Sequence, residues 1–289
     1  MTEPASTDTE YQASQLADFL ARHDNVLALT GAGVSTASGI PDYRDRDGVR
    51  RGRDPIQGPE FRKSDAVRRR YWARSMVGWP TLANARSNAG HRAIAHLEAR
   101  GKLSAVITQN VDGLHQQAGS ERVLELHGNI HYVRCLECRS RFTRAFIQTL
   151  LQECNPHMQG AHAAPAPDGD AHLEPAALEY FRVPKCIYCA GVLKPDVVFF
   201  GDGVAPDRTE QAFADLDRAD ALLVIGSSLM VYSGFRFCRA AAEAGKPIAL
   251  VNLGKTRADG LIGLKIAESA ERVLPSVCTQ LDQSLRQHL

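Results

Sequence analysis

The chain has 289 residues, of which 44% are hydrophobic and 23% are charged, and its formal net charge is +1. A chain of this length can bury one large core and still form a small second domain. The near-neutral charge argues against nucleic acid or an acidic membrane as a partner, and no apolar run approaches the roughly 20 residues of a spanning helix. The acidic segment 1–10 resembles neither a signal nor a transit peptide, so we expect a cytoplasmic protein. We also expect a monomer.

Apolar runs and amphipathic segments alternate along the chain, as in a doubly wound parallel sheet. Short, almost wholly apolar runs are typical of strands that are covered on both faces. Predicted strands lie at 26–30, 104–108, 123–126, 195–201, 221–225 and 247–251. Predicted helices lie at 7–23, 88–98, 207–217 and 234–244. The sequence therefore predicts an α/β protein.

A glycine-rich turn follows the first of these strands. Gly31 and Gly33 lack the Cβ atoms that would keep a pyrophosphate away from the backbone. Thr36 replaces the third glycine of the dinucleotide fingerprint, and Asp54, at the spacing of the usual ribose-binding acid, follows no apolar run. Taken alone, the turn fits a nucleotide site or a structural corner between two elements.

Polar side chains follow four of the predicted strands, at 109–112, at His127, at 226–228 and at 252–254. Ligand contacts in open α/β sheets lie at these carboxyl ends. Two structural alternatives stay open here: Asp112 can cap a helix, and a lone histidine after a strand is often structural.

Four of the seven cysteines form two C-x-x-C pairs, separated by the 47 residues 139–185. An odd total argues against a disulfide framework, whereas four thiolates form a closed tetrahedral zinc site with a structural role. Redox thiols and a nucleic-acid-binding zinc ribbon are the alternatives. Within the long spacer we expect a helix at 142–151 and a loop at 161–170. The predicted ligands are Cys135, Cys138, Cys186 and Cys189.

The segment 44–74 holds eleven Arg or Lys against five Asp or Glu, which is also what a solvated surface produces. Tyr71 and Arg74 stand three apart on a predicted helix and could hold one carboxylate together. The alternative places Tyr71 in the core and Arg74 in water.

Several motifs together resemble those of the sirtuins, the NAD-consuming lysine deacylases. They are Gly31–Ser35 followed by Gly39–Arg44, Thr108–His115, and Leu126–Gly128 just before the first cysteine pair. Matching motifs run in the family's order from Leu27 to about Asn252. The resemblance implies a Rossmann-like NAD-binding domain (1–44, 88–132 and 190–289), a helical module with the cofactor loop (45–87) and a zinc-binding module with a long insertion (133–189).

The resemblance also implies roles for individual residues. His127 would be the general base, while Asn110 and Asp112 would orient the nicotinamide ribose. The acyl-lysine substrate would contact Tyr71, Arg74, Val198, Phe199, Phe200 and Gly201. The cofactor would contact Gly31, Ala32, Gly33, Ser35, Asp42, Tyr43, Arg44, Gln109, Asn110, Val111, Asp112, Gly226, Ser227, Ser228, Asn252, Leu253, Gly254 and Ala270.

The implied reaction transfers an acyl group from a protein lysine to ADP-ribose, with NAD as co-substrate and release of nicotinamide. The long spacer 139–185 resembles class II, and the motifs 70–74, 77–80, 194–202 and 231–234 resemble most its sirtuin-4 type. Deacetylation, acidic acyl groups and lipoyl-type groups all remain open as activities. A mono-ADP-ribosyltransferase and a non-catalytic NAD sensor are the alternatives.

Overall fold

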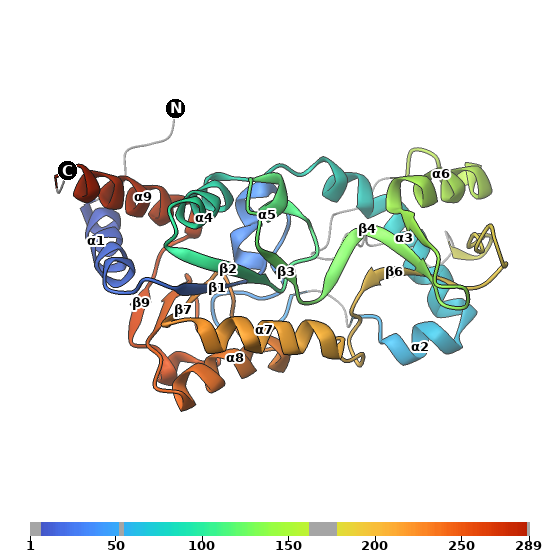
Figure 1. Cartoon of the computed structure of the whole chain (residues 1–289). Helices are drawn as coiled ribbons and strands as arrows, with labels where there is room; N and C mark the ends of the chain where they lie inside the picture. The colour runs from blue at the N-terminus through green and yellow to red at the C-terminus, as the bar shows by residue number, and fades with distance from the viewer. Residues whose placement is uncertain (1–6, 52–54, 162–177, 288–289) are drawn as a thin grey trace.

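The computed structural model describes residues 7–51, 55–161 and 178–287. Figure 1 shows two parts: a large sheet with helices on both faces, and a smaller part built around β4, β6, α2, α3 and α6. Asp54 and nearly all of the loop predicted at 161–170 lie outside the described residues.

The large part is a six-stranded sheet with the order β3-β2-β1-β7-β8-β9, in which every neighbouring pair is parallel. The predicted fold class, a Rossmann-like parallel sheet, is therefore confirmed. The strands are β1 (Val26–Thr30), β2 (Leu103–Thr108), β3 (Val123–Glu125), β7 (Ala221–Ile225), β8 (Ile248–Val251) and β9 (Leu264–Ile266).

Helices cover both faces of this sheet (Figure 1). Alternate residues of β1 show why: Val26 and Ala28 pack with one helical layer, whereas Leu27 and Leu29 pack with the other. The first layer holds α1 (Thr7–Ala21), α4 (Ala89–Ala99) and α9 (Ala270–Gln287). The second layer holds α7 (Pro206–Arg218) and α8 (Tyr232–Glu243).

The turn after β1 differs from a simple strand-to-helix corner. Two single 3₁₀ turns, η1 (Ala32–Val34) and η2 (Thr36–Ser38), follow it in place of a continuous α-helix. The remaining short elements of the large part are α5 (Leu114–Gln117) and η5 (Asp259–Leu261).

The smaller part has its own three-stranded antiparallel sheet of order β5-β4-β6. Its core is a separate hydrophobic cluster that includes Trp72, Phe61 and Leu193. The strands are β4 (Gly128–Cys135), β5 (Arg141–Thr143) and β6 (Leu193–Val197), and the helices are α2 (Gly58–Lys63), α3 (Asp65–Asn84), α6 (Arg144–Cys154) and η3 (Pro156–Met158).

Two predicted boundaries in this part are wrong. The helix predicted at 142–151 begins only at Arg144, because Phe142 pairs with Val133 in the small sheet. The strand predicted at 195–201 is β6, which starts two residues earlier and ends at Val197. A proline is tolerated in β6 because this strand lies at the edge of its sheet.

Two elements of the large part were not predicted: the three-residue strand β9 and the eighteen-residue helix α9. No helix within the described ranges is both long and apolar enough to cross a membrane. The predicted domain bounds, including 45–87 and 133–189, remain a prediction.

Candidate active site

One cavity of about 1010 Å³ gathers residues that follow all six parallel strands. It is lined by every predicted catalytic, cofactor and substrate residue except Arg74. The predicted lining residues that it brings together are Gly31, Ala32, Gly33, Ser35, Asp42, Tyr43, Arg44, Tyr71, Gln109, Asn110, Val111, Asp112, His127, Val198, Phe199, Phe200, Gly201, Gly226, Ser227, Ser228, Asn252, Leu253, Gly254 and Ala270.

The glycine turn after β1 meets the turn after β7 at the centre of the sheet, where the strand order reverses. A Cβ on Gly31 would lie 2.7 Å from Cβ of Ser227, and one on Gly33 would lie 2.8 Å from the Gly226 carbonyl oxygen. Gly226 itself has φ +61°, which favours glycine. These glycines are therefore required by the contact of two loops, in addition to any approach of a phosphate.

A hydrogen-bond network holds the polar residues that follow β2. The Asn110 amide donates to the Gly31 carbonyl and to Ser35 Oγ, both at 3.1 Å. Ser35 Oγ donates to Asp112 Oδ2 at 2.7 Å, and the Leu114 N–H donates to Asp112 Oδ1 at 3.0 Å. Asp112 therefore lines the cavity and accepts a hydrogen bond from the first residue of α5, although the N-cap residue of that helix is Gly113. The network fixes both side chains before a ligand binds.

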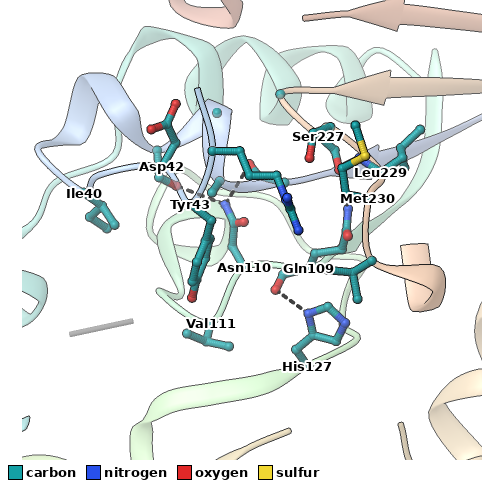
Figure 2. Close-up of a pocket in the computed structure, with 18 of the residues that line it drawn as sticks. Ile40, Asp42, Tyr43, Gln109, Asn110, Val111, His127, Ser227, Leu229 and Met230 are labelled. Atoms are coloured by element: carbon teal, nitrogen blue, oxygen red, sulfur yellow. Dashed lines mark hydrogen bonds between the residues drawn. The ribbon is translucent and has the colours of Figure 1, made fainter. Parts of the chain in front are cut away.

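His127 enters the cavity from the turn between β3 and β4 (Figure 2). Its Nδ1 lies 2.9 Å from the carbonyl oxygen of Gln109, and its Nε2 lies 2.8 Å from Ser233 Oγ. Because a carbonyl can only accept, Nδ1 carries the proton, and Nε2 of the neutral ring is the acceptor. The imidazole therefore has a fixed orientation with its basic nitrogen at the cavity.

The surroundings of His127 favour the neutral, basic form of the ring. Burial lowers the pKa of His127, although the hydrogen bond to the Gln109 backbone acts in the opposite direction. The guanidinium groups of Arg236 and Arg208 lower the same pKa further by charge repulsion. Near pH 7 the ring can accept a proton.

Two further histidines lie beneath the cavity floor, fully or almost fully buried. Burial lowers the pKa of His91 to about 4, against the attraction of Asp112, and burial lowers the pKa of His115 to about 3. The two rings meet edge to face at a centroid distance of 5.0 Å. His91 Nε2 lies 3.4 Å from Ser35 Oγ, so these neutral rings support the network that holds Asp112.

The predicted cofactor loop folds back on itself over the cavity. The Arg44 guanidinium donates to the Gly48 carbonyl at 2.8 Å, and Arg44 forms an antiparallel bridge with Arg50. The Arg50 guanidinium lies 5.1 Å from the ring centroid of Phe200. The loop thus places cationic side chains at a cavity that could take an anionic ligand.

The other end of the cavity is aromatic. The Tyr71 ring lies edge to face against Phe61 and Phe199, with centroids 5.5 and 5.2 Å apart. Tyr71 is only 6% exposed, yet it lines the cavity. Arg74, one turn further along α3, is partly buried and is not a lining residue. The structure therefore brings only the phenol of this pair to the cavity.

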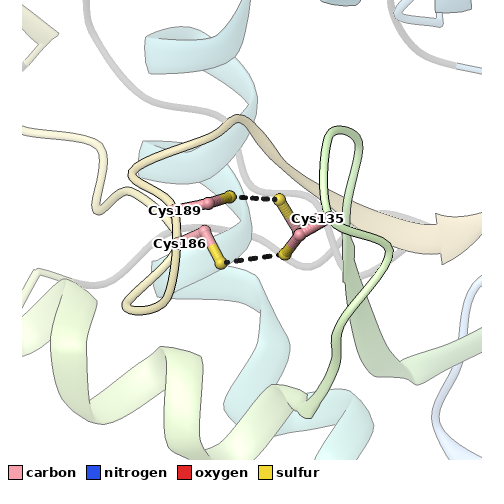
Figure 3. Close-up of side chains that lie close together, drawn as sticks. Cys135, Cys186 and Cys189 are labelled. Carbon is pink, nitrogen blue, oxygen red and sulfur yellow. Dashed lines mark hydrogen bonds between the residues drawn. The ribbon is translucent and has the colours of Figure 1, made fainter.

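The four predicted cysteine ligands converge in the smaller part (Figure 3). Their sulfur atoms all lie within 4.8 Å of one another, and none of the four forms a disulfide. The distances Cys135–Cys189 and Cys138–Cys186 are 3.5 and 3.7 Å, close to the roughly 3.8 Å between ligands in a tetrahedron with Zn–S bonds of about 2.3 Å. The cluster fits a closed, structural zinc site.

Sequence reasoning gave no role in the site to several lining residues, among them Ser233, Arg236, Glu268 and Glu271. The hydroxyl of Ser233 contacts His127 across 106 positions of sequence, so no local spacing could indicate it. Glu268 and Glu271 flank the start of α9, a helix whose apolar spacing at Val273, Leu274, Val277 and Leu281 was the available signal.

A parallel sheet with glycine turns at its switch point, and with an oriented imidazole in the same cavity, defines a dinucleotide-using α/β enzyme. The family model described as the Sir2 family matches residues 31–233, more than half of the chain. The chain therefore belongs to the Sir2 family. The predicted membership of the sirtuins is confirmed, and with it the class of enzyme, which uses NAD as a co-substrate.

Named relatives agree with this assignment. The NAD-dependent protein deacetylase of Xanthomonas campestris pv. campestris (strain 8004) is 54% identical over 259 residues, covering 90% of this chain and 88% of the relative. NAD-dependent protein deacetylase 3 of Pseudomonas syringae pv. tomato is 52% identical and covers 88% and 91% of the two chains. A solved Sir2 homologue in complex with NAD has a TM-score of 0.72 at 29% identity, covering 99% of this chain and 98% of its own.

Proposed function

We propose that this protein is an NAD-dependent protein-lysine deacylase that releases nicotinamide and O-acyl-ADP-ribose, with His127 as the general base. The observation that supports it most is the orientation of His127. A neutral imidazole, held by the Gln109 carbonyl, presents Nε2 to the cavity that also contains the glycine turn and the Asn110–Asp112 pair. Relatives named NAD-dependent protein deacetylases support the same reaction class.

In the proposed reaction, the acyl oxygen of the modified lysine attacks the anomeric carbon of the nicotinamide ribose, and the bond to nicotinamide breaks. A ribose hydroxyl then loses its proton toward His127 and attacks the former amide carbon. Water adds to this carbon and the lysine amine leaves. The carbon then releases its original oxygen, which stays on the anomeric carbon as a hydroxyl, while the acyl group stays on the attacking ribose oxygen. General bases of this kind contribute about 10²- to 10⁴-fold to a rate.

The proposed roles of the neighbouring residues follow from the network that holds them. The NH₂ group of Asn110 is used within the protein, so its side-chain oxygen can accept from a ribose hydroxyl. Asp112 would bind the nicotinamide end, and the turns at Gly31, Gly33 and Ser227 would surround the phosphates. Positioning before binding lowers the entropy cost of the reaction.

We propose that the protein substrate binds as an extended strand beside Val198–Gly201, where the chain leaves β6 and lines the cavity. A solved Sir2 structure that contains a p53 peptide and NAD, with a TM-score of 0.71 and 29% identity, supports a peptide as the substrate. The zinc site would hold the smaller part together without entering the reaction, since four thiolates leave no open position on the metal.

The sequence motifs at 70–74 and 194–202 are what support the finer proposal of a class II, sirtuin-4-type enzyme. An acidic acyl chain would reach the Tyr71 phenol, and Arg74 would have to turn toward the cavity to join it. Lipoyl-type groups would instead use the apolar ring surfaces of Phe199 and Phe200, which line the cavity.

The test is a panel of acetyl-, succinyl- and lipoyl-lysine peptides with NAD, read by mass spectrometry of peptide and nucleotide. We expect loss of the acyl group together with equal amounts of nicotinamide and O-acyl-ADP-ribose. ADP-ribose attached to the peptide would instead indicate a mono-ADP-ribosyltransferase. Binding of NAD with no nicotinamide released from any peptide would indicate a sensor.

A further inference from the structure

The first turn of α8 supplies a hydroxyl to the proposed base. Ser233 Oγ lies 2.8 Å from His127 Nε2, and both side chains line the cavity. Since Nδ1 of the neutral ring carries its proton toward the Gln109 carbonyl, the Ser233 hydroxyl must be the donor to Nε2. The lone pair that would accept the substrate proton is therefore already occupied.

The backbone around Ser233 is held in place. Arg236 Nε donates to the Ser233 carbonyl at 3.1 Å, and the Arg236 guanidinium packs over the rings of Phe213 and Phe237. The next residue, Gly234, allows α8 to approach the Gln109 side chain, because a Cβ there would lie 2.5 Å from Gln109 Oε1. The carbonyl and the hydroxyl that hold His127 are thus brought together by one packing contact.

We propose that Ser233 relays the proton from the ribose hydroxyl to His127, an inference that rests on the function proposed above. As the ribose O–H bond breaks, its proton passes to Ser233 Oγ and the electron pair stays on the ribose oxygen. At the same time the Ser233 proton passes to Nε2, so one imidazolium forms and the serine is unchanged. The ribose oxygen then bonds to the acyl carbon.

The relay makes a prediction that a purely structural role does not make. Breaking the bond to nicotinamide requires no base, so the loss of Ser233 should spare that half of the reaction and slow the acyl transfer. Exchange of labelled nicotinamide into NAD measures the first half, in the presence of an acetyl-lysine peptide. Formation of O-acetyl-ADP-ribose measures the second half.

The experiment compares Ser233→Ala, Ser233→Thr and His127→Ala with the wild type. For Ser233→Ala we expect nicotinamide exchange within about threefold of wild type and a fall in kcat for acyl transfer of about 10- to 100-fold. Ser233→Thr keeps a hydroxyl and should restore most of the transfer. Ser276→Ala is the matched control. Ser276 also lies on a helix, α9, and its hydroxyl donates to Glu10 of α1 at an exposed position.

Acyl transfer by Ser233→Ala at or above the wild-type rate would overturn the relay, as would an equal loss of both halves that Ser233→Thr does not restore. Wild-type transfer by His127→Ala would instead overturn the proposed function itself. The two failures are therefore distinguishable.

Discussion

The two parts of the molecule are held together in different ways. The parallel sheet is buried on both faces by two apolar helical layers, and its chemistry comes from backbone turns at the strand ends. The smaller part has three short antiparallel strands, one apolar cluster and a group of four cysteines. Its strands cannot bury two faces, so side-chain chemistry has to supply more of its stability.

A buried arginine illustrates the difference. Arg144 is fully buried in the smaller part, with its guanidinium 5.4 Å from the ring centroid of Trp72 and 4.9 Å from that of Trp79. It donates to Gln148 and to the Ser75 carbonyl, and burial lowers its pKa to about 10. No equivalent buried cation stands among the described residues of the parallel sheet. The smaller part thus depends on specific polar contacts.

The largest expected effect is the loss of the smaller part's metal. Cys186→Ser should abolish binding of one zinc per chain, because three thiolates no longer close the tetrahedron. Zinc binding to small zinc peptides is worth on the order of 10 kcal/mol, and that energy is folding energy. Metal analysis and thermal unfolding measure the outcome.

Cys154→Ser is the control for this change, since Cys154 is exposed and lies outside the cluster. We expect it to keep both the zinc and the melting temperature. Unchanged zinc content in Cys186→Ser would contradict the four-cysteine site.

The next largest effect is the loss of acyl transfer, without loss of NAD binding, when His127 in the parallel part is replaced. His127→Ala should lower acyl transfer by at least about 100-fold, because the cavity loses its proton acceptor. Affinity for NAD, measured by calorimetry, should change little, since the phosphate turns are intact. His96→Gln is the control, because His96 pairs with Asp282 away from the cavity.

A third prediction concerns the core of the smaller part. Trp72 is fully buried, and its Nε1 donates to the Leu193 carbonyl at 3.2 Å. Trp72→Ala should lower the free energy of unfolding by about 3–5 kcal/mol, through the cavity and the orphaned carbonyl. Phe146→Ala, at a side chain that is 40% exposed, should cost far less. Equal costs in chemical denaturation would refute this description of the core.

The last prediction concerns a loss of stability in acid, which is absent at neutral pH. His91 and His115 have folded pKa values of about 4 and about 3, below the usual 6.5, so their contribution is complete above pH 6.5. It is lost as the pH falls from about 6.5 toward 4 and 3, and each shift corresponds to on the order of 3 kcal/mol. Unfolding curves between pH 8 and pH 4 should show this slope, and His115→Gln should flatten it.

Most of the parallel part could be predicted from the sequence, because local patterns determine it. Val26–Thr30 and Ala221–Ile225 are apolar runs with clear ends, and the structure has these strands at the predicted bounds. Helix α9 was missed because Pro275 lies inside it, and a proline beyond the first turn normally indicates that a helix is interrupted. The edge strand β9 has only three residues, too few for a pattern.

The site was predictable only to the extent that it follows strand ends. Gly31, Asn110 and His127 each lie within two residues of a strand end and meet because the strands are parallel. The contact of Ser233 with His127 depends on how α8 packs, which no local spacing encodes. The same reason explains Arg74: helical spacing places it near Tyr71 but does not say which side chain faces the cavity.

The most direct test of this account is a crystal structure of the protein with NAD and an acetyl-lysine peptide. The account predicts the phosphates at the turns of Gly31 and Ser227, and a nicotinamide-ribose hydroxyl within hydrogen-bond distance of Ser233 Oγ or His127 Nε2. A dinucleotide bound outside this cavity, with its ribose far from His127, would contradict it.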